Sequence, residues 1–270
     1  MKKYNVAIVG PLGVVGRKIT TILEERNFPI NKIKLLGTET NKNKQILFKG
    51  QKVYTEVAKK GAFTDVDIVF FCAGNQVSKE LGPIAVEEGA LVIDNSSAWR
   101  MDPKVPLIIP EVNPEDLNWH KGIIANPNCS STQMLVALKP IHDKYKIKRV
   151  VVSTYQAVSG TGKDAIDELN QQILEYINDK QISHSIYPHQ ILFNVLPHID
   201  DFLDTGYTKE EMKMIDESKK VLDEDINITA TTVRLPIVSG HSESINIETK
   251  FPINIKELRE LFSNSKGIKI

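Results

Sequence analysis

The sequence has little cysteine, no net charge and no long apolar run. Its two cysteines, Cys72 and Cys129, show neither metal-ligand spacing nor a disulfide framework, so we expect no metal site and a reducing cytoplasm. The 34 basic and 34 acidic residues cancel, which argues against nucleic acid or a membrane surface as a partner. No apolar run approaches the roughly 20 residues of a membrane span. The apolar start leads directly into a glycine turn, which favours a first strand over a signal peptide.

The first part of the chain contains alternating strand and helix patterns. Asn5–Gly10 is a short β-branched apolar run, glycines follow at Gly13 and Gly16, and apolar residues then recur at helical spacing to about Glu25. A helical pattern covers 78–88, and further short apolar runs lie at 33–36, 67–74 and 91–94. This order predicts an α/β protein with a Rossmann-like dinucleotide-binding domain at residues 1–128.

The second part, residues 129–270, contains strands of another kind. Three segments alternate between apolar and polar residues, as strands of a sheet with one solvated face do: 149–158, 228–235 and 244–250. Helical patterns lie at 131–138, 164–178 and 208–222, and Thr208 followed by Glu211 forms a capping box at the start of the last one. We therefore expect an α+β domain with a mixed sheet.

The segment Gly10-Pro-Leu-Gly-Val-Val-Gly16 joins the first strand to the first helix. In that position, backbone N–H groups at the helix N-terminus can face a pyrophosphate. Any tight turn can have this glycine spacing, but the strand–helix context favours dinucleotide binding. The following loop at 37–44 is ambiguous. Glu39 suits the ribose hydroxyl of NAD, Lys42 and Lys44 suit the 2′-phosphate of NADP, and a solvated polar loop is the plain alternative.

Cys129 is the candidate nucleophile. It lies in Asn-Pro-Asn-Cys-Ser-Ser-Thr at 126–132, a turn that leads into a helix, and a helix N-terminus favours the thiolate. A buried structural cysteine is the commoner fate of a lone thiol. Cys72, inside an apolar run, fits that description, whereas the polar neighbours of Cys129 do not. A thiolate in a nicotinamide-binding chain indicates hydride transfer through a thioester.

Six sequence blocks resemble the aspartate-semialdehyde dehydrogenase family in order and approximate spacing. The specific ones are NPNCSST at 126–132 and RLPIVSGHSE at 234–243. The others are the glycine loop, NSSAWR at 95–100, STYQAVSGTG at 153–162 and YTKEEMK at 207–213. The resemblance implies reductive dephosphorylation of L-4-aspartyl phosphate in lysine, threonine, methionine and diaminopimelate biosynthesis. It also implies a homodimer or higher homo-oligomer, with the second domain serving catalysis and dimerisation.

The resemblance further implies catalytic roles for four residues. Cys129 would attack the acyl carbon of aspartyl phosphate through a thioester, and His241 would act as general acid/base. Asn128 would shape the site around the thiol, and Gln156 would orient the acyl group.

The same resemblance implies that four charged residues bind the substrate. Arg234 would hold the α-carboxylate by a bidentate contact and Glu210 would receive the amino group. Arg100 and Lys213 would bind phosphate. Two cations, one further arginine and one glutamate thus complement a ligand that carries a phosphate, a carboxylate and an ammonium.

The implied cofactor is NADP. The residues assigned to it by the resemblance are Gly10, Leu12, Gly13, Val14, Val15, Gly16, Thr38, Thr40, Asn41, Gly74, Ser159, Gly160, Thr161 and Gly162. Two departures from the family pattern bear on this assignment. Pro11 and Leu12 replace Ala-Thr in the glycine loop, and Thr40 and Asn41 stand where the family has Arg-Ser beside the 2′-phosphate. These changes weaken the preference for NADP, and Glu39 indicates tolerance of NAD.

Two alternatives stand beside this hypothesis. A reductase of N-acetylglutamyl phosphate would share the Cys/His chemistry, but Glu210 makes sense opposite a free amino group and little sense opposite an acetylated one. A non-catalytic homologue that binds substrate or a partner subunit is the other. The altered glycine loop favours it, as does the expected absence of the family's C-terminal tail beyond Ile270.

Overall fold

The computed structural model describes residues 2–270, which form two compact units. The first comprises the chain up to Ile108 together with Pro114–Pro127. The second comprises Ile109–Asn113 and Asn128–Ile270. Within the described residues, no helix is both long enough and apolar enough to cross a membrane.

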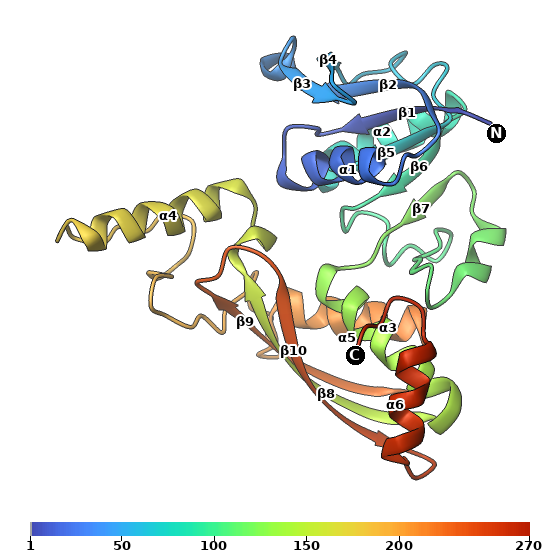
Figure 1. Ribbon diagram of the computed structural model, residues 1–270, viewed down its shortest axis with the longest axis vertical. Coiled ribbons are helices and arrows are strands. Elements are labelled where there is room, and N and C mark those ends of the chain that lie inside the picture. The colour runs from blue at the N-terminus through green and yellow to red at the C-terminus, as the bar shows by residue number, and fades with distance from the viewer. Residues whose placement is uncertain (1) are drawn as a thin grey trace. The chain divides into compact units, whose positions relative to one another are not determined.

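The first unit contains a seven-stranded sheet with the order β3-β4-β2-β1-β5-β6-β7 (Figure 1). Neighbouring strands are parallel except β3 and β4, which are antiparallel. The strands are β1 (Tyr4–Val9), β2 (Ile30–Gly37), β3 (Gln45–Phe48), β4 (Gln51–Val57), β5 (Ile68–Phe71), β6 (Leu91–Asp94) and β7 (Ile123–Ala125). The helices are α1 (Val14–Glu25) and α2 (Asn75–Glu87), with 3-10 turns η1 (Glu39–Asn41) and η2 (Pro114–Trp119). The predicted doubly wound parallel sheet is confirmed.

The β3–β4 hairpin is an element that the sequence analysis missed. Its two loop residues, Lys49 and Gly50, have φ angles of 49° and 76°. Positive φ at both central residues is the requirement of a type I′ hairpin turn, and Lys-Gly between two alternating segments was a local signal for it. Ile46 and Phe48 are the buried residues of β3 and join the core under the sheet.

The second unit contains a three-stranded mixed sheet with the order β10-β8-β9. Its strands are β8 (Ile147–Ala157), β9 (Asn227–Leu235) and β10 (His241–Thr249), and β8 is parallel to β9 but antiparallel to β10. The helices are α3 (Cys129–Tyr145), α4 (Lys163–Ile177), α5 (Lys209–Val221) and α6 (Ile255–Asn264), and a 3-10 turn, η3, spans Val158–Gly160. The predicted mixed sheet is confirmed, and the last strand begins three residues earlier than predicted.

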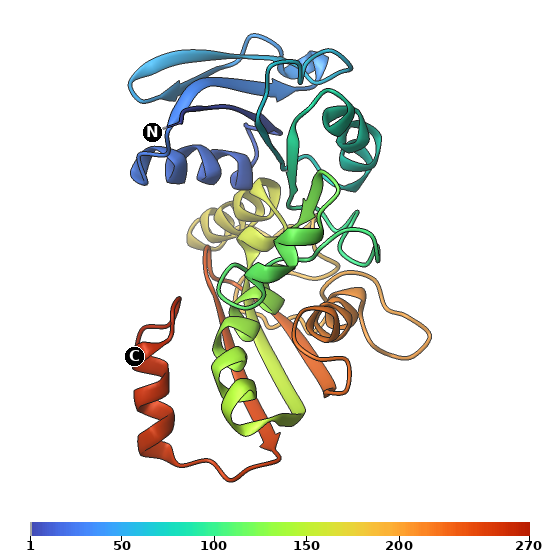
Figure 2. The ribbon, with the colours of Figure 1, turned by 90° about the vertical axis from the view of Figure 1, so that its right-hand side faces the viewer.

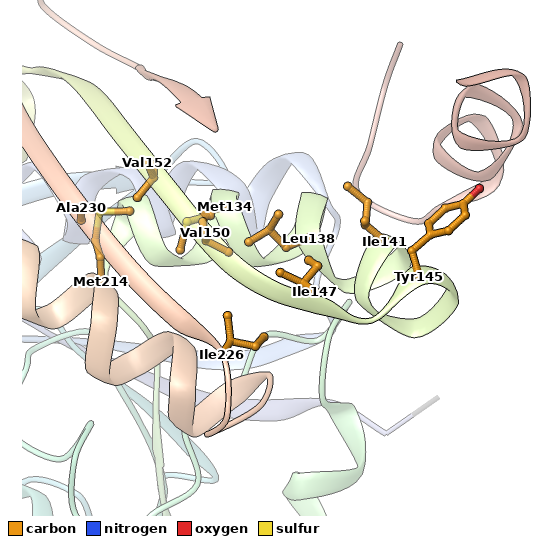
Figure 3. Close-up of a cluster of buried hydrophobic side chains, with 10 residues drawn as sticks. All are labelled: Met134, Leu138, Ile141, Tyr145, Ile147, Val150, Val152, Met214, Ile226 and Ala230. Atoms are coloured by element: carbon orange, nitrogen blue, oxygen red, sulfur yellow. The ribbon is translucent and has the colours of Figure 1, made fainter. Parts of the chain in front are cut away.

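Helix α3 is longer than predicted and continues through Pro140 to Tyr145. Proline weakens a helix interior because it removes one backbone hydrogen bond. Packing outweighs that cost here, since Met134, Leu138 and Ile141 are buried on one face of the helix in a shared core (Figure 3). The same core includes Val150 and Val152 of β8, Met214 of α5 and Ala230 of β9.

Helices α3 and α5 pack against one face of the β10-β8-β9 sheet (Figure 1). Helix α6, which the sequence analysis missed, runs along α3 (Figure 2), and Leu258, Leu261 and Phe262 join the shared core. Asn254 caps α6 by accepting hydrogen bonds from the N–H groups of Lys256 and Glu257. The alternation along β10 places His241 and Glu243 toward the helices and leaves Ser242 and Ser244 exposed.

Candidate functional site

Cys129 is the first residue of α3, and Asn128 is its N-cap. The Oδ1 atom of Asn128 accepts hydrogen bonds from the N–H groups of Ser130 at 2.9 Å and Ser131 at 3.3 Å. The N–H of Asn128 in turn donates to Oε2 of Glu217 on α5 at 2.6 Å. An asparagine cap is among the strongest helix starts, so these bonds fix the position of the thiol at the head of the helix.

His241, the first residue of β10, is the partner of Cys129. Its Nε2 lies 3.3 Å from Sγ of Cys129. Its Nδ1 accepts a hydrogen bond from the backbone N–H of Ala157 at 3.0 Å. Because Nδ1 is an acceptor, the proton of the neutral ring lies on Nε2 and points toward the sulfur. Burial lowers the pKa of His241 below its usual value, as does the charge of Arg234, so the ring is neutral at pH 7.

Three side chains of the site form one row across the β10-β8-β9 sheet. His241 pairs in register with Gln156, and Gln156 pairs with Arg234. Residues at one register position of adjacent strands share a face, so the three lie side by side. Nη1 of Arg234 donates to the carbonyl oxygen of Ala157 at 2.7 Å and to Oε1 of Gln156 at 3.4 Å.

Arg234 is buried, and its Nε has no hydrogen-bond partner in the part of the chain that the structure describes. A buried donor without a partner is costly unless a ligand satisfies it, and a carboxylate suits a guanidinium best. Gly160 lies directly against this group, because a Cβ there would stand 2.8 Å from Nη1 of Arg234 and 3.6 Å from Nε2 of His241.

Glu210 lies in the first turn of α5, where the predicted capping box of Thr208 and Glu211 is confirmed. Its Oε1 accepts from Nδ2 of Asn128 at 3.0 Å and from Nε2 of Gln156 at 3.3 Å. Lys213, one turn further, approaches the other oxygen at 3.3 Å. The cap of α5 thus places the buried carboxylate of Glu210 next to two side-chain amides. One belongs to Asn128, which precedes the cysteine, and the other to Gln156 of the sheet.

The thiol of Cys129 is accessible, and its pKa is raised above the model-compound value of 9.0. The surrounding protein desolvates the thiolate, and the carboxylate of Glu210 repels it; bonds from Ser130 and the charge of Arg234 act in the opposite direction. The net direction is opposite to the one expected from the helix N-terminus alone. Burial and a nearby anion outweigh the helix here.

In the first unit, the glycine loop borders a cavity of about 320 Å³. Gly10 has φ +82°, and a Cβ there would meet the carbonyl of Cys72 at 2.8 Å. A Cβ on Gly16 would stand 2.2 Å from the carbonyl oxygen of Gly10. These two glycines are therefore required by the turn and by close helix–strand packing, whereas a Cβ on Gly13 would make only an ordinary contact, 3.6 Å from the carbonyl oxygen of Gly10. The cradle fits a dinucleotide.

The predicted cofactor residues divide between several places. Gly10, Leu12, Gly13, Thr38 and Asn41 line the cavity, together with Cys72, which sequence reasoning had treated as structural only. Val14, Val15, Gly16, Thr40 and Gly74 are not among the residues that line it. The hydroxyls of Thr38 and Thr40 bond to each other at 2.8 Å, and Gly74 caps α2 with φ +85°. Burial raises the pKa of Cys72 to about 12, so this thiol stays protonated.

The four other predicted cofactor residues, at 159–162, lie in the second unit around η3, where Gly160 is next to His241. The hydroxyl of Thr161 accepts from Tyr187 at 3.0 Å.

Arg100 belongs to the first unit. It is buried, and its Nη2 donates to the carbonyl oxygen of Asn95 at 3.1 Å. Asp94 anchors this loop, because its carboxylate accepts from Ser78 at 2.8 Å and Ser96 at 2.7 Å. No local sequence pattern singled out this buried aspartate.

A second contact between α3 and β10 was also missed. Gln133, one turn after Cys129, donates to Oε1 of Glu243 at 2.7 Å, and Glu243 lies two residues after His241 on the same face. The i, i+4 spacing on the helix and the i, i+2 spacing on the strand could have indicated this pair. Burial raises the pKa of Glu243 to about 7.

Comparisons with known proteins fit this arrangement. The domain family described as "Semialdehyde dehydrogenase, NAD binding domain" matches residues 5–120, and "Semialdehyde dehydrogenase, dimerisation domain" matches residues 138–270. A nucleotide-binding sheet followed by a domain with a Cys–His pair therefore defines an oxidoreductase of the semialdehyde dehydrogenase class.

The relatives are more specific. Aspartate-semialdehyde dehydrogenase of Aquifex aeolicus is 54% identical over 98% of this chain and 79% of its own length, and that of Bacillus subtilis is 45% identical over 98% and 80%. The crystal structure of aspartate semialdehyde dehydrogenase II from Vibrio cholerae complexed with ASA covers the whole chain at TM-score 0.96 and 42% identity, over 81% of its own length. The chain belongs to the aspartate-semialdehyde dehydrogenase family, as the sequence blocks predicted.

Proposed function

We propose that the protein reduces L-4-aspartyl phosphate to L-aspartate 4-semialdehyde with release of phosphate. The observation that carries the proposal is the 3.3 Å contact between Sγ of Cys129 and Nε2 of His241, set among Asn128, Gln156, Glu210 and Arg234. The substrate's α-carboxylate would satisfy the free Nε of Arg234, and its ammonium would pair with Glu210. An N-acetylated substrate would leave the carboxylate of Glu210 without a cation, so we do not favour the acetylglutamyl alternative.

The chemistry follows from these groups. The thiolate of Cys129 attacks the acyl carbon, the bond from carbon to the phosphate oxygen breaks, and a thioester remains on the enzyme. Hydride chemistry at the thioester carbon would come from the nicotinamide cofactor when it is bound. The Nε2–H of His241 stabilises first the sulfur and then the oxygen that gains charge, and collapse of the adduct releases the aldehyde and restores the thiolate.

Substrate binding would also activate the nucleophile. Glu210 is one cause of the raised pKa of Cys129. An ammonium group paired with Glu210 would offset that repulsion, while the α-carboxylate on Arg234 would offset the opposing effect of that cation. Glu210 has the larger influence of the two on the thiol, so pairing it with an ammonium group would lower the pKa of Cys129. An acyl phosphate without an amino group would lack this effect.

NADP is the proposed cofactor, with NAD tolerated. Thr38 and Asn41 line the cavity in the first unit at the position where the family pattern has its 2′-phosphate loop, and Glu39, Lys42 and Lys44 lie nearby on the surface. A hydroxyl and an amide can bind either a phosphate or a ribose hydroxyl. The ratio of kcat/KM for the two nucleotides measures the preference.

The proposal extends to assembly and cellular role. We propose a homodimer in the cytoplasm that serves lysine, threonine, methionine and diaminopimelate biosynthesis. Exposed apolar side chains on and near α4, among them Leu174, Ile177 and Phe193, support self-association because a monomer rarely leaves such a group in water. Light scattering that finds only monomer at high concentration would contradict the dimer.

The test is a spectrophotometric assay of this 270-residue chain. Aspartate semialdehyde, phosphate and NADP or NAD are supplied, and reduced nicotinamide is followed beside the variants Cys129→Ala and Cys72→Ala. We expect turnover that Cys129→Ala abolishes and Cys72→Ala retains. A folded Cys129→Ala protein with normal turnover would refute the proposal, and faster turnover of N-acetylglutamate semialdehyde would transfer it to the acetylated substrate.

A further inference from the structure

Lys213, the proposed phosphate ligand of the second unit, already has two carboxylate partners. Its Nζ lies 2.7 Å from Oδ2 of Asp200 and 3.3 Å from Oε2 of Glu210. The side chains of Lys213 and Asp200 are 29% and 35% exposed, so this ion pair lies at the edge of the site and is only partly screened by water. A single ammonium thus faces two negative charges before any phosphate arrives.

The two carboxylates are held with different firmness. Glu210 is buried and accepts hydrogen bonds from Asn128 and Gln156, so its movement would leave two buried donors without partners. Asp200 lies in the loop before α5, with φ +67°, and its Oδ1 accepts from the N–H of Asp201 at 3.0 Å. Its carboxylate can rotate into water without leaving a buried group unsatisfied.

We propose that Asp200 is an internal counter-ion that occupies Lys213 when phosphate is absent and is displaced by an incoming phosphoryl group. This inference rests on the proposed function, because it takes Lys213 as a phosphate ligand. Asp200 thereby sets the affinity of the site for phosphate without contacting the reacting carbon.

The charge states support this exchange. Burial on its own would raise the pKa of Asp200, but the hydrogen bond and charge of Lys213 outweigh it and hold the pKa below its usual value. The pKa of Lys213 is raised by the same two carboxylates against the opposing effect of burial. Asp200 is therefore an anion at neutral pH, where it competes with phosphate for one cation.

Asp200→Asn tests the inference, and Asp201→Asn is the matched control. Asparagine keeps the shape of the side chain and tolerates positive φ as well as aspartate does. Asp201 is the next residue, and its carboxylate forms an ion pair at 2.6 Å with Lys209, a lysine that has no proposed role in binding phosphate. The KM for inorganic phosphate is measured in the oxidative direction at saturating aspartate semialdehyde and NADP, at constant ionic strength.

We expect Asp200→Asn to lower the phosphate KM roughly two- to fivefold, the range for removing one partly exposed ion-pair competitor. Asp201→Asn should leave it unchanged. A phosphate KM that is unchanged in Asp200→Asn overturns the proposal, and one that rises indicates instead that Asp200 positions Lys213 for phosphate.

A second measurement separates this inference from the proposed function. Inorganic phosphate raises the unfolding temperature of a protein that binds it, and this shift needs no turnover. We expect Asp200→Asn to reach half of its maximal shift at a lower phosphate concentration than the wild type. If the wild type does not oxidise aspartate semialdehyde, the proposed function fails; the thermal shift then decides on Asp200 alone, and equal half-maximal concentrations overturn its role.

Discussion

The backbone N–H of Ala157 donates a hydrogen bond to Nδ1 of His241 at 3.0 Å, and this bond decides what the histidine can do for Cys129. The ring presents Nε2–H to the sulfur, so in this state it is a hydrogen-bond donor to the thiolate. It can accept a second proton only by giving up the bond from Ala157. The resting histidine is therefore set up to stabilise negative charge, first on sulfur and then on the substrate oxygen.

This relationship predicts a specific tautomer and acid behaviour. We expect nitrogen NMR of the protein at pH 7 to detect the Nε2–H form of His241. The pKa of His241 lies below 6.5 because burial disfavours its charged form, so the imidazolium forms only as the pH falls below that value. Loss of turnover by protonation of His241 should occur in the same range, and a His241→Ala variant should lose roughly 10²- to 10⁴-fold in kcat. An Nδ1–H form at pH 7 would contradict this account.

The two cysteines should differ in their reaction with iodoacetamide. Cys129 is accessible and has a raised pKa, whereas the pKa of Cys72 is raised to about 12 and its side chain is half-buried. We expect mass spectrometry to find Cys129 modified much faster, at a rate that rises with pH toward and above 9, because only the thiolate reacts. The variant Cys129→Ala should then be almost unreactive, and equal modification of both thiols would contradict the assignment.

Gly160→Ala should disturb substrate binding more than folding. The added methyl would stand 2.8 Å from Nη1 of Arg234, which must therefore shift. We expect KM for aspartate semialdehyde to rise roughly tenfold with little change in unfolding temperature. A tenfold rise corresponds to a loss of about 1.4 kcal/mol of binding free energy. In an Arg234→Lys background, Gly160→Ala should raise KM by a smaller factor, because both substitutions act on the contact between residue 234 and the substrate carboxylate. Simple additivity of the two effects would indicate that Gly160 acts elsewhere.

Glu243 should make stability depend on pH. Its pKa rises from 4.5 to about 7 on folding, so the folded state holds a proton that the unfolded state releases between these values. The free energy of unfolding therefore falls as the pH rises through this window. We expect Glu243→Gln to be more stable than the wild type at pH 8 by about 1–2 kcal/mol, with the advantage absent near pH 4.

The control for this prediction is Glu248→Gln on the same strand. Glu248 is exposed on the opposite face of β10, where it pairs loosely with Lys148 at 3.5 Å. Urea or thermal unfolding at both pH values should find no comparable pH-dependent gain for this variant. A gain of the same size would assign the effect to net charge and not to the burial of Glu243.

Much of the local structure could be predicted because its causes are local. The capping box of Thr208 and Glu211 needs four consecutive residues, and the glycine loop needs a strand followed by a helix. The hairpin turn at Lys49 and Gly50 was equally local and was missed, because one glycine after lysine is a weaker signal than Asn-Gly. Helix α3 extends beyond its predicted end because burial of its apolar face outweighs the disruption by Pro140.

The sequence by itself determined the alternation of strands and helices, the presence of a helix just after Cys129 and the residue types of a site for an acyl phosphate. Only the tertiary structure decided that Gln156 lies between His241 and Arg234, since strand register joins segments far apart in the chain. It also decided the protonation states. The tautomer of His241, the raised pKa of Cys129 and the pairing of Asp200 with Lys213 depend on burial and on distances between groups, and neither is encoded in any single stretch of residues.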